Sequence, residues 1–362
     1  MMITERSSFQ IINLLNNHMK LSSKHFYNTA DFSQKEINYL IDLALKMKKG
    51  QFKKSLPGKS LAMLFFNPSL RTRLSFTIAM QKLGGLGVDF PIKDGYTFEC
   101  ELGKIMDKGT IEHIKDAAKV ISSYCNVIAV RASDLITSSS ESVKVQEWSE
   151  LKKDKTIKSF MEYADVPVIN MESNVYHPCQ GLGDAVTIKE KLGKTKKKKY
   201  VMTWVSHPKS LPMATPNSQI LSACDLGMDV VIAHPEGWEL DTEIMKTMKQ
   251  KAEEAGGSLS ISHSQKEACQ NADVVCAKSW GALKNYGNWD YEKKLKENLN
   301  GWIVNKNLMD ITNNAIFMHC LPVRRNVEVT DEVIDSKNSV VIDEAENRMW
   351  AQMALLQSLI KS

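Results

Sequence analysis

Short apolar runs alternate with helical patterns from about residue 60 to the end of the chain. Such runs are typical of buried strands. They predict strands at Ser60–Phe66, Val88–Ile92, Val127–Ala132, Val166–Met171, Tyr200–Ser206, Val230–His234, Leu259–His263, Val274–Ser279, Ile316–Leu321 and Val340–Asp343. Between several of them apolar residues recur three and four positions apart, and in Ile111–Tyr124 this spacing predicts a helix.

This alternation predicts an α/β fold of two domains, with largely parallel sheets flanked by helices. Ligands bind to such sheets beyond the carboxyl ends of the strands. The lysine run Lys194–Lys199 separates two sets of strands, so we place the domain boundary there. The expected parts are an extension over 1–23, a first domain over 24–196, a second domain over 197–344, and a helix over 345–362 that packs back on the first domain.

The composition changes the picture by excluding several classes of protein. A chain of 362 residues that is 43% hydrophobic and 25% charged is typical of a globular protein with two cores. No apolar run approaches the roughly 20 residues of a membrane-spanning helix, and the N-terminus makes a poor secretory signal. Seven scattered cysteines without a C-x-x-C pair indicate reduced thiols. We therefore expect a cytoplasmic protein without a membrane partner.

The net charge of +5 is mild and is concentrated in Lys194–Lys199. Such a run is a candidate for nucleic-acid binding. However, it directly precedes the apolar strand from residue 200, and no aromatic residues alternate with the lysines as in a single-strand platform. We interpret the run as a solvated loop and expect no nucleic-acid partner.

The segment Phe65–Phe76, FFNPSLRTRLSF, carries the strongest chemical signal. A strand ends, Asn-Pro interrupts it, and Ser69 is a good N-cap for the helix that follows. Free N–H groups and the positive dipole at a helix start bind anions, and the arginines and hydroxyls at 69–73 add charge-assisted bonds to phosphate. A capped helix with surface arginines is the alternative, but it does not require this combination of residues. The segment therefore predicts a phosphate site.

Two further segments follow strands. His177-Pro178-Cys179-Gln180 offers a histidine donor for a carbonyl oxygen and an amide, although His177 is equally typical of a helix cap. His319-Cys320-Leu321-Pro322 ends a strand and exposes two backbone carbonyls as acceptors. Cys320 is also a possible nucleophile. The histidines form no metal-binding motif, and no nucleotide-binding glycine motif follows a strand, so we expect no metal and no cofactor.

Taken together and in this order, FFNPSLRTR, HPCQ and HCLP resemble the aspartate/ornithine carbamoyltransferase superfamily, over nearly the whole chain from about residue 24. Within it, TWVSHPKSLPMATPNS, AKSWGAL, MHCLPVRRNVEVTDEVID and IDEAENR resemble the members that act on N-acetylornithine and N-succinylornithine. The Ser-Met-Gly loop of enzymes for free ornithine is absent. The resemblance implies a carbamoyl-phosphate-binding first domain, an acylornithine-binding second domain, and a carbamoyltransferase of arginine biosynthesis.

The resemblance also implies roles for individual residues. Arg71, Arg131 and His177 would be catalytic. Carbamoyl phosphate would be held by Ser69, Leu70, Arg71, Thr72, Tyr96, Arg131, His177, Gln180, Cys320, Leu321 and Arg348, and the acylornithine by Glu172, Lys278, Leu321 and Ile111. Without the resemblance, Lys278 could be interpreted as a surface lysine at the end of a strand and Glu172 as a partner of a helix dipole, rather than as substrate-binding residues. Relatives form homotrimers with shared sites, so we expect a second copy of this chain as a partner.

Three departures from the family pattern bear on specificity. Tyr96 stands where relatives place a tryptophan that reaches in from the adjacent subunit. Ile111 stands where acetyl-type relatives have glutamate and succinyl-type relatives have proline. An apolar residue favours a succinyl acceptor modestly, whereas the sequence as a whole is nearer the acetyl enzymes, so the acyl group stays open. Glu328 stands where some relatives have a modifiable lysine, so no carboxylated lysine is expected there.

The expected reaction is attack of the neutral side-chain amine of N-acetylornithine on the carbonyl carbon of carbamoyl phosphate. Arg131, His177 and Thr72 would stabilise the negative charge that grows on the carbonyl oxygen. The departing phosphate is a suitable proton acceptor, because the sequence offers no strong candidate for a dedicated base. The alternatives are N-succinylornithine or free ornithine as acceptor and, in another class, a non-catalytic anion-binding module.

Overall fold

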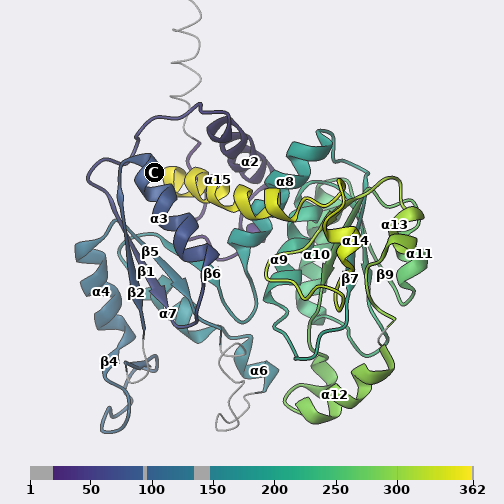
Figure 1. The fold of residues 1–362 in the computed structure, drawn as a ribbon. Coiled ribbons are helices and arrows are strands. Elements are labelled where there is room, and N and C mark those ends of the chain that lie inside the picture. Colours follow the sequence, from purple (N-terminus) through teal and green to yellow (C-terminus); the bar gives the residue numbers. More distant parts are fainter. Residues whose placement is uncertain (1–18, 93–95, 134–146, 300, 361–362) are drawn as a thin grey trace, which may run out of the picture.

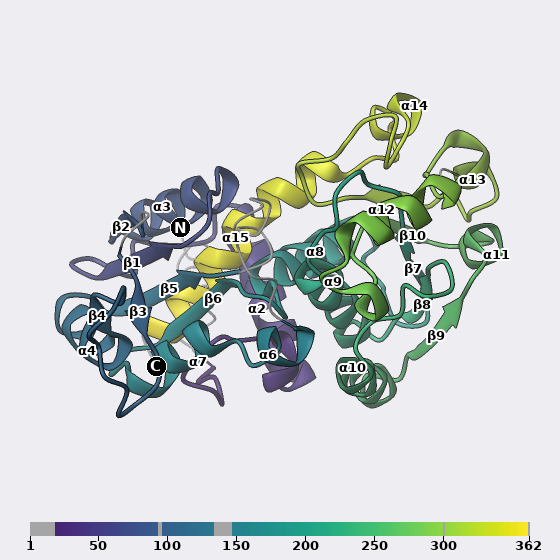
Figure 2. The same ribbon diagram turned by 90° about the horizontal axis from the view of Figure 1, so that it is seen from below.

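The protein is described by a computed structural model that covers residues 19–92, 96–133, 147–299 and 301–360. Two parallel sheets lie side by side, each flanked by helices, and α8 and α15 lie between and across them (Figures 1 and 2). The predicted α/β class with two largely parallel sheets is confirmed. Most of the predicted extension over 1–23 lies outside the described residues.

The first sheet has the strand order β2-β1-β5-β6, and all its pairs are parallel. Its strands are β1 (Ser60–Phe65), β2 (Leu86–Pro91), β5 (Val127–Arg131) and β6 (Val168–Glu172). Alternate strand residues face two cores. Met63 and Ala129 lie in the core shared with α2 (Gln34–Lys48), α3 (Arg71–Leu83), α8 (Pro178–Leu192) and α15 (Val341–Ile360), whereas Leu64 and Val130 lie in the core under α4 (Ile114–Tyr124) and α7 (Lys155–Tyr163).

The second sheet has the order β11-β10-β7-β8-β9, again parallel throughout. Its strands are β7 (Lys199–Trp204), β8 (Asp229–Ala233), β9 (Ser258–Ser262), β10 (Val274–Lys278) and β11 (Ile316–Met318). The helices of this half are α9 (Ala214–Asp225), α10 (Thr242–Glu254), α11 (Gln265–Cys269), α12 (Trp289–Lys296), α13 (Lys306–Asp310) and α14 (Asp331–Ile334). The remaining elements are α6 (Trp148–Leu151), the small parallel pair β3 (Phe98–Glu99) and β4 (Glu112–His113), and three 3₁₀ turns, η1 (Thr29–Asp31), η2 (Leu283–Asn285) and η3 (Glu297–Leu299).

Helix α15 begins beside the second sheet and ends beside the first, where it contacts α2, α3 and α8 (Figure 2). The predicted strand Val340–Asp343 is wrong, because Val341 is the first residue of this helix. A short apolar run has the same pattern in a strand and in a buried helix. Here the run continues into a helix whose later residues, such as Ala351 and Leu355, are fully buried. Burial of this helix stabilises the helical form of the run over a strand.

Two other boundaries differ from the prediction. The helix predicted from Ile111 begins at Ile114, because His113 Nδ1 accepts a 3.1 Å hydrogen bond from the backbone N–H of Lys115 and caps it. The strand predicted over Ile316–Leu321 ends at Met318. The other predicted strands are present with small shifts at their ends. No helix among the described residues is long and apolar enough to cross a membrane.

Candidate active site

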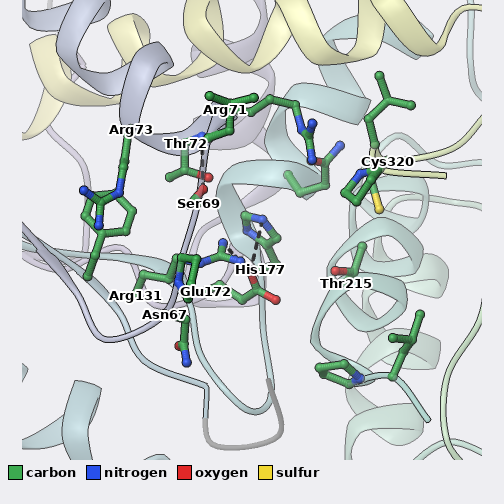
Figure 3. Close-up of a pocket in the computed structure, with 18 of the residues that line it drawn as sticks. Asn67, Ser69, Arg71, Thr72, Arg73, Arg131, Glu172, His177, Thr215 and Cys320 are labelled. Atoms are coloured by element: carbon green, nitrogen blue, oxygen red, sulfur yellow. Dashed lines mark hydrogen bonds and ion pairs between the residues drawn. The ribbon is translucent and has the colours of Figure 1, made fainter. Parts of the chain in front are cut away.

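A cavity of about 1220 Å³ opens where the carboxyl ends of strands from both sheets meet. In Figure 3 the side chains of Arg131 and His177 lie on one side of it, and those of Thr215 and Cys320 lie on the other. The residues that line it are Phe65, Phe66, Asn67, Pro68, Ser69, Leu70, Arg71, Thr72, Arg73, Pro91, Ile92, Arg131, Glu172, His177, Gln180, His207, Leu211, Pro212, Thr215, Lys278, Cys320, Leu321, Pro322, Glu328 and Arg348. Most of the residues predicted from the sequence are therefore brought together.

The loop between β1 and α3 forms one wall of the cavity. Asn67 is buried and fixes the loop, since its side chain donates to the carbonyl of Ser133 at 3.0 Å and accepts from the N–H of Ser133 at 2.7 Å. The N-cap position is held by Leu70, yet Ser69 Oγ accepts a 3.3 Å hydrogen bond from the N–H of Thr72. The predicted N-cap is therefore off by one residue, but Ser69 still satisfies one N–H of the first turn of α3, whose positive end faces the cavity.

Four guanidinium groups line the cavity, of which that of Arg73 is paired with Asp89. Burial lowers the pKa of Arg71, and the neighbouring Arg131 lowers it further. Burial also lowers the pKa of Arg348, with Arg131 and Arg71 acting in the same direction. The buried Nε atoms of Arg131 and Arg348 have no hydrogen-bond partner among the described residues. Clustered cations with unused donors are what a bound anion would neutralise.

Arg131, Glu172 and His177 form a second group at the ends of β5 and β6. Arg131 Nη1 is paired with Glu172 Oε2, and His177 Nε2 lies 3.7 Å from the same oxygen. Burial lowers the pKa of His177 well below 6.5, and the charges of Arg348, Arg131 and Lys278 lower it further. His177 is therefore neutral, and its buried Nδ1 has no partner in the described part of the chain. His177 occupies the N-cap position of α8, as the alternative interpretation has it, but its side chain makes no capping hydrogen bond and lines the cavity instead.

The opposite wall comes from the second sheet. Burial alone would lower the pKa of Lys278, but nearby acidic groups, Glu328 and Glu172 among them, raise it, so the ammonium stays charged. Burial raises the pKa of Cys320 to about 12, which keeps it a thiol and argues against covalent catalysis. Burial opposes the charge of Glu328, yet His319 and Lys278 lower its pKa to about 2.

His207 lines the same wall but was not singled out from the sequence. Its Nε2 accepts a 2.8 Å hydrogen bond from Arg324 Nε, so the ring hydrogen is on Nδ1, which donates to the carbonyl of Lys209 at 3.0 Å. The signal that could have indicated it is its position just after β7, because the carboxyl ends of parallel strands carry the ligand site. Thr215 and Glu328 have no comparable signal in the sequence pattern.

Two predicted site residues do not reach the cavity of their own chain. Tyr96 is exposed and its hydroxyl donates to Glu112 Oε2 at 2.5 Å. Ile111 is 56% exposed. Both lie beside β3 and β4, away from the lining residues. Among the described residues, no group of three or more His, Cys, Asp or Glu is arranged to hold a metal ion.

The comparisons with known proteins agree with this geometry. The carbamoyl-phosphate-binding domain model of aspartate/ornithine carbamoyltransferases matches residues 24–190, and the Asp/Orn-binding domain model matches residues 213–359. N-acetylornithine carbamoyltransferase of Xanthomonas campestris pv. campestris is 44% identical over 94% of this chain and 98% of its own length. N-succinylornithine carbamoyltransferase of Bacteroides fragilis is 38% identical over 88% of this chain and 93% of its own.

A crystal structure of acetylornithine transcarbamylase with acetylcitrulline superposes with a TM-score of 0.88. It is 44% identical and covers 93% of this chain and 99% of its own. Domain models that span both halves, relatives of this identity and a shared fold point to one family. This chain belongs to the aspartate/ornithine carbamoyltransferase family.

Proposed function

We propose that the protein transfers the carbamoyl group of carbamoyl phosphate to the side-chain amine of N-acetyl-L-ornithine, giving N-acetyl-L-citrulline and phosphate in arginine biosynthesis. One observation carries the proposal. Arg131, Arg348 and His177 all line one cavity, and each keeps a buried nitrogen without a partner in the described residues. A substrate with a phosphate and a carbonyl group would satisfy such donors.

The phosphate of carbamoyl phosphate would lie at the start of α3. There the backbone N–H groups of residues 70 and 71 and the helix dipole favour an anion, and Arg71 adds a guanidinium at the same turn. The backbone of Leu70 contributes to this turn, although its side chain is exposed. Arg348, which reaches the same turn from α15, would neutralise the second charge.

The carbonyl oxygen of the substrate would face Arg131, His177 and Thr72. The hydroxyl of Thr72 accepts a hydrogen bond from Arg348, so its own hydrogen is free to donate to the substrate. His177 is neutral and would donate from one ring nitrogen. These donors would stabilise the charge that grows on the oxygen, and loss of one such donor typically costs about 3–4 kcal/mol of barrier. Cys320 and Leu321 would accept hydrogen bonds from the carbamoyl NH₂ through their backbone carbonyls.

The attacking amine must be neutral. A lysine-like amine has a pKa roughly 3 units above neutral pH, so deprotonation costs about 4–5 kcal/mol. The groups in the cavity are poor bases, because the pKa of Glu328 is about 2 and that of His177 is well below 6.5. Burial near the cationic cluster would lower the pKa of the amine. We assign the role of final proton acceptor to the departing phosphate.

The acylated amino acid would bind between the two sheets. The charged ammonium of Lys278 suits the α-carboxylate. Glu172 would accept a hydrogen bond from the amide N–H of the acyl group. In the described structure Glu172 is paired with Arg131. Binding of carbamoyl phosphate next to Arg131 would therefore compete with this pair and make Glu172 available to the second substrate.

We further propose a homotrimer that works in the cytoplasm. An apolar strip of exposed side chains, which comprises Leu70, Leu74, Leu86, Val88 and Phe90, runs over α3 and the edge strand β2. Such a strip on an unpaired edge is typical of an interface, and a second copy of this chain is the occupant that the family relationship favours. In the trimer, Tyr96 and Ile111 of one subunit would reach the cavity of the next. All seven cysteines are free thiols, in keeping with a reducing compartment.

The test is to incubate the protein with carbamoyl phosphate and, separately, with N-acetylornithine, N-succinylornithine and ornithine, and to measure the citrulline-type product. We expect N-acetylornithine to give the highest kcat/KM. Turnover of ornithine alone would contradict the proposal. N-succinylornithine is the second candidate, because the apolar and exposed Ile111 would not repel a succinyl carboxylate.

A further inference from the structure

A fully buried cluster lies behind the carbamoyl end of the cavity. The side-chain amide of Gln180 donates from Nε2 to Asp184 Oδ1 at 2.7 Å and to Glu344 Oε1 at 2.9 Å. Gln180, Asp184 and Glu344 are 2%, 1% and 1% exposed, and only Gln180 lines the cavity. The cluster thus joins Gln180, which is predicted to bind the substrate, to two acidic residues that have not yet been given a role.

The two carboxyl groups fix the orientation of the amide. A flipped Gln180 would place its oxygen against both carboxyl oxygens, which is repulsive, so both amide hydrogens must point at Asp184 and Glu344. The side-chain oxygen Oε1 of Gln180 is then the polar atom left for the cavity. An oxygen there accepts a hydrogen bond, and the NH₂ of a carbamoyl group is the donor it would select.

The charge of the cluster does not balance if both carboxyls are ionised. Within the described residues, Asp184 and Glu344 accept hydrogen bonds from neutral groups, namely Gln180, the Gln219 side chain at 2.7 Å and the N–H of His319 at 3.0 Å. Two adjacent buried carboxylates without an ion-pair partner cost several kcal/mol. One proton held between them removes one charge and supplies the hydrogen bond that joins them.

We infer that Asp184 and Glu344 share one proton and act as positioning residues, which hold the Gln180 amide with its oxygen toward the carbamoyl NH₂. The inference rests on the proposed function. Burial raises the pKa of both carboxyls, and the charge of Asp184 raises that of Glu344 further, so the pair keeps a proton at neutral pH. The titratable or charged groups that face the pair are Arg348 on α15, Tyr200 on β7, Cys276 on β10 and Cys320.

The placement of Glu344 gives the pair a second effect. Its Oε2 accepts from the backbone N–H of His319, directly before Cys320 and Leu321, whose carbonyls are expected to receive the same NH₂ group. One turn later in α15, Arg348 bonds to Thr72. Glu344 therefore ties the segments that hold Gln180 and Cys320 to the helix that also reaches the phosphate loop.

The first experiment is infrared spectroscopy of the full-length protein at pH 7 in deuterated buffer. A protonated carboxyl group gives a C=O band that a carboxylate lacks. The spectrum of the wild type minus that of Glu344→Gln is expected to contain one such band. The matched control is Glu346→Gln, which removes an exposed carboxylate from the same helix, and the spectrum of this variant is expected to keep the band. Absence of the band from the wild-type difference spectrum would overturn the shared proton.

The second experiment separates positioning from a purely structural role. Carbamoyl phosphate affinity is measured by calorimetry without acceptor, and KM for each substrate by steady-state kinetics. Glu344→Ala is expected to weaken carbamoyl phosphate binding about tenfold and to leave KM for the acylornithine within about twofold. Glu344→Gln keeps a neutral donor to Asp184 and loses only the acceptor for His319. Its loss of carbamoyl phosphate affinity is therefore expected to be smaller than that of Glu344→Ala.

Unchanged carbamoyl phosphate affinity in Glu344→Ala, or a larger loss in Glu344→Gln than in Glu344→Ala, would overturn the inference. The infrared band and the calorimetric affinity are both independent of turnover. The wild type could show the band, and its carbamoyl phosphate affinity could fall in Glu344→Ala, while no acylornithine is turned over. The proposed function would then be wrong, and the inference about the positioning pair would stand. A wild type that binds no carbamoyl phosphate would overturn both.

Discussion

The guanidinium of Arg348 donates a 2.6 Å hydrogen bond from Nη2 to the hydroxyl of Thr72. The two residues are 276 positions apart in the sequence, and both are buried. The bond joins the last helix of the chain to the first turn of α3, where the phosphate is expected to bind. Formation of the phosphate site therefore depends on the docking of α15.

Thr72→Val tests this connection, because it keeps the shape of the side chain and removes the hydroxyl. A hydrogen bond to a charged group contributes about 1.5–3 kcal/mol, and the substitution also leaves Arg348 with one partner fewer. We expect KM for carbamoyl phosphate to rise at least about tenfold, with a further fall in kcat because the donor to the carbonyl oxygen is lost. Thr77→Val, on the same helix but outside the cavity lining, is expected to leave both constants unchanged.

Arg71→Ala tests the phosphate site itself. Arg71 lies at the first position of α3 and is only partly buried, so its removal leaves no cavity in a core. We expect kcat/KM for carbamoyl phosphate to fall by about a hundredfold to a thousandfold, the range for loss of one charge-stabilising donor. The melting temperature is expected to stay within a few degrees.

The matched control is Arg325→Ala, which removes an exposed arginine that is paired with Asp331 and Asp335 and does not line the cavity. It is expected to turn over substrate at the wild-type rate. Near-normal turnover by Arg71→Ala would refute the assignment of the phosphate to this helix start.

The three chemical segments were predictable from the sequence because each follows the carboxyl end of a strand in a parallel sheet. That rule alone places the loops after β1 and β6 at one edge of the first sheet and the loop after β11 at the corresponding edge of the second sheet. The order of the strands within each sheet did not have to be known. The family resemblance then supplied roles for individual side chains that the strand pattern cannot supply.

What the sequence could not indicate are relationships that depend on burial in three dimensions. The pairing of Arg131 with Glu172 and the contact of Gln180 with Glu344 join residues whose distance follows only from the packing of the sheets and of α15. The start of α15 was also misjudged, because Val340–Asp343 has the same apolar pattern as a short strand. Tyr96 and Ile111 lie outside the cavity of one chain, and no pattern within a single chain shows whether they reach the cavity of another.

His177 gives a prediction with a defined dependence on pH. Its pKa is 6.5 in the unfolded chain and well below that value in the folded protein. Between these values the unfolded chain binds more protons, so the free energy of unfolding rises with pH by up to about 1.4 kcal/mol per unit. The contribution of the neutral His177 to the free energy of unfolding is therefore fully present above pH 6.5 and is lost as the pH falls toward the folded-state pKa.

Urea unfolding of the wild type and of His177→Asn between pH 5 and pH 8 measures this slope, which the variant is expected to reduce. The variant is also expected to lower kcat by about a hundredfold, as loss of an oxyanion donor does. His234→Asn is the control, because burial also lowers the pKa of His234 although it lies outside the cavity. It is expected to reduce the slope and to leave kcat unchanged. An unaltered slope in both variants would contradict the neutral, buried state of these rings.

The lysine run offers a test of the expectation that no nucleic acid is bound. Lys197 and Lys198 are paired with Asp229 and Asp273, and Lys199 Nζ donates to the carbonyl of Gln270 at 2.8 Å. Replacement of Lys196–Lys199 by glutamine is expected to lower the free energy of unfolding by about 1–2 kcal/mol, since exposed pairs contribute up to about 1 kcal/mol each. Kinetic constants and retention on a DNA column are expected to be unchanged. A large fall in DNA retention would indicate a nucleic-acid surface instead.

The choice of acyl group is expected to depend on Ile111 of a neighbouring subunit. Ile111 is 56% exposed and carries no charge, so a succinyl carboxylate near it would meet no repulsion. Ile111→Glu would place a like charge there, and two such charges about 4 Å apart repel by at least about 1 kcal/mol. The ratio of kcat/KM for N-succinylornithine to that for N-acetylornithine is therefore expected to fall at least about fivefold. Ile111→Gln, of similar size but uncharged, separates charge from shape and is expected to change the ratio less. Equal ratios in the wild type and in Ile111→Glu would show that this position does not face the acyl group.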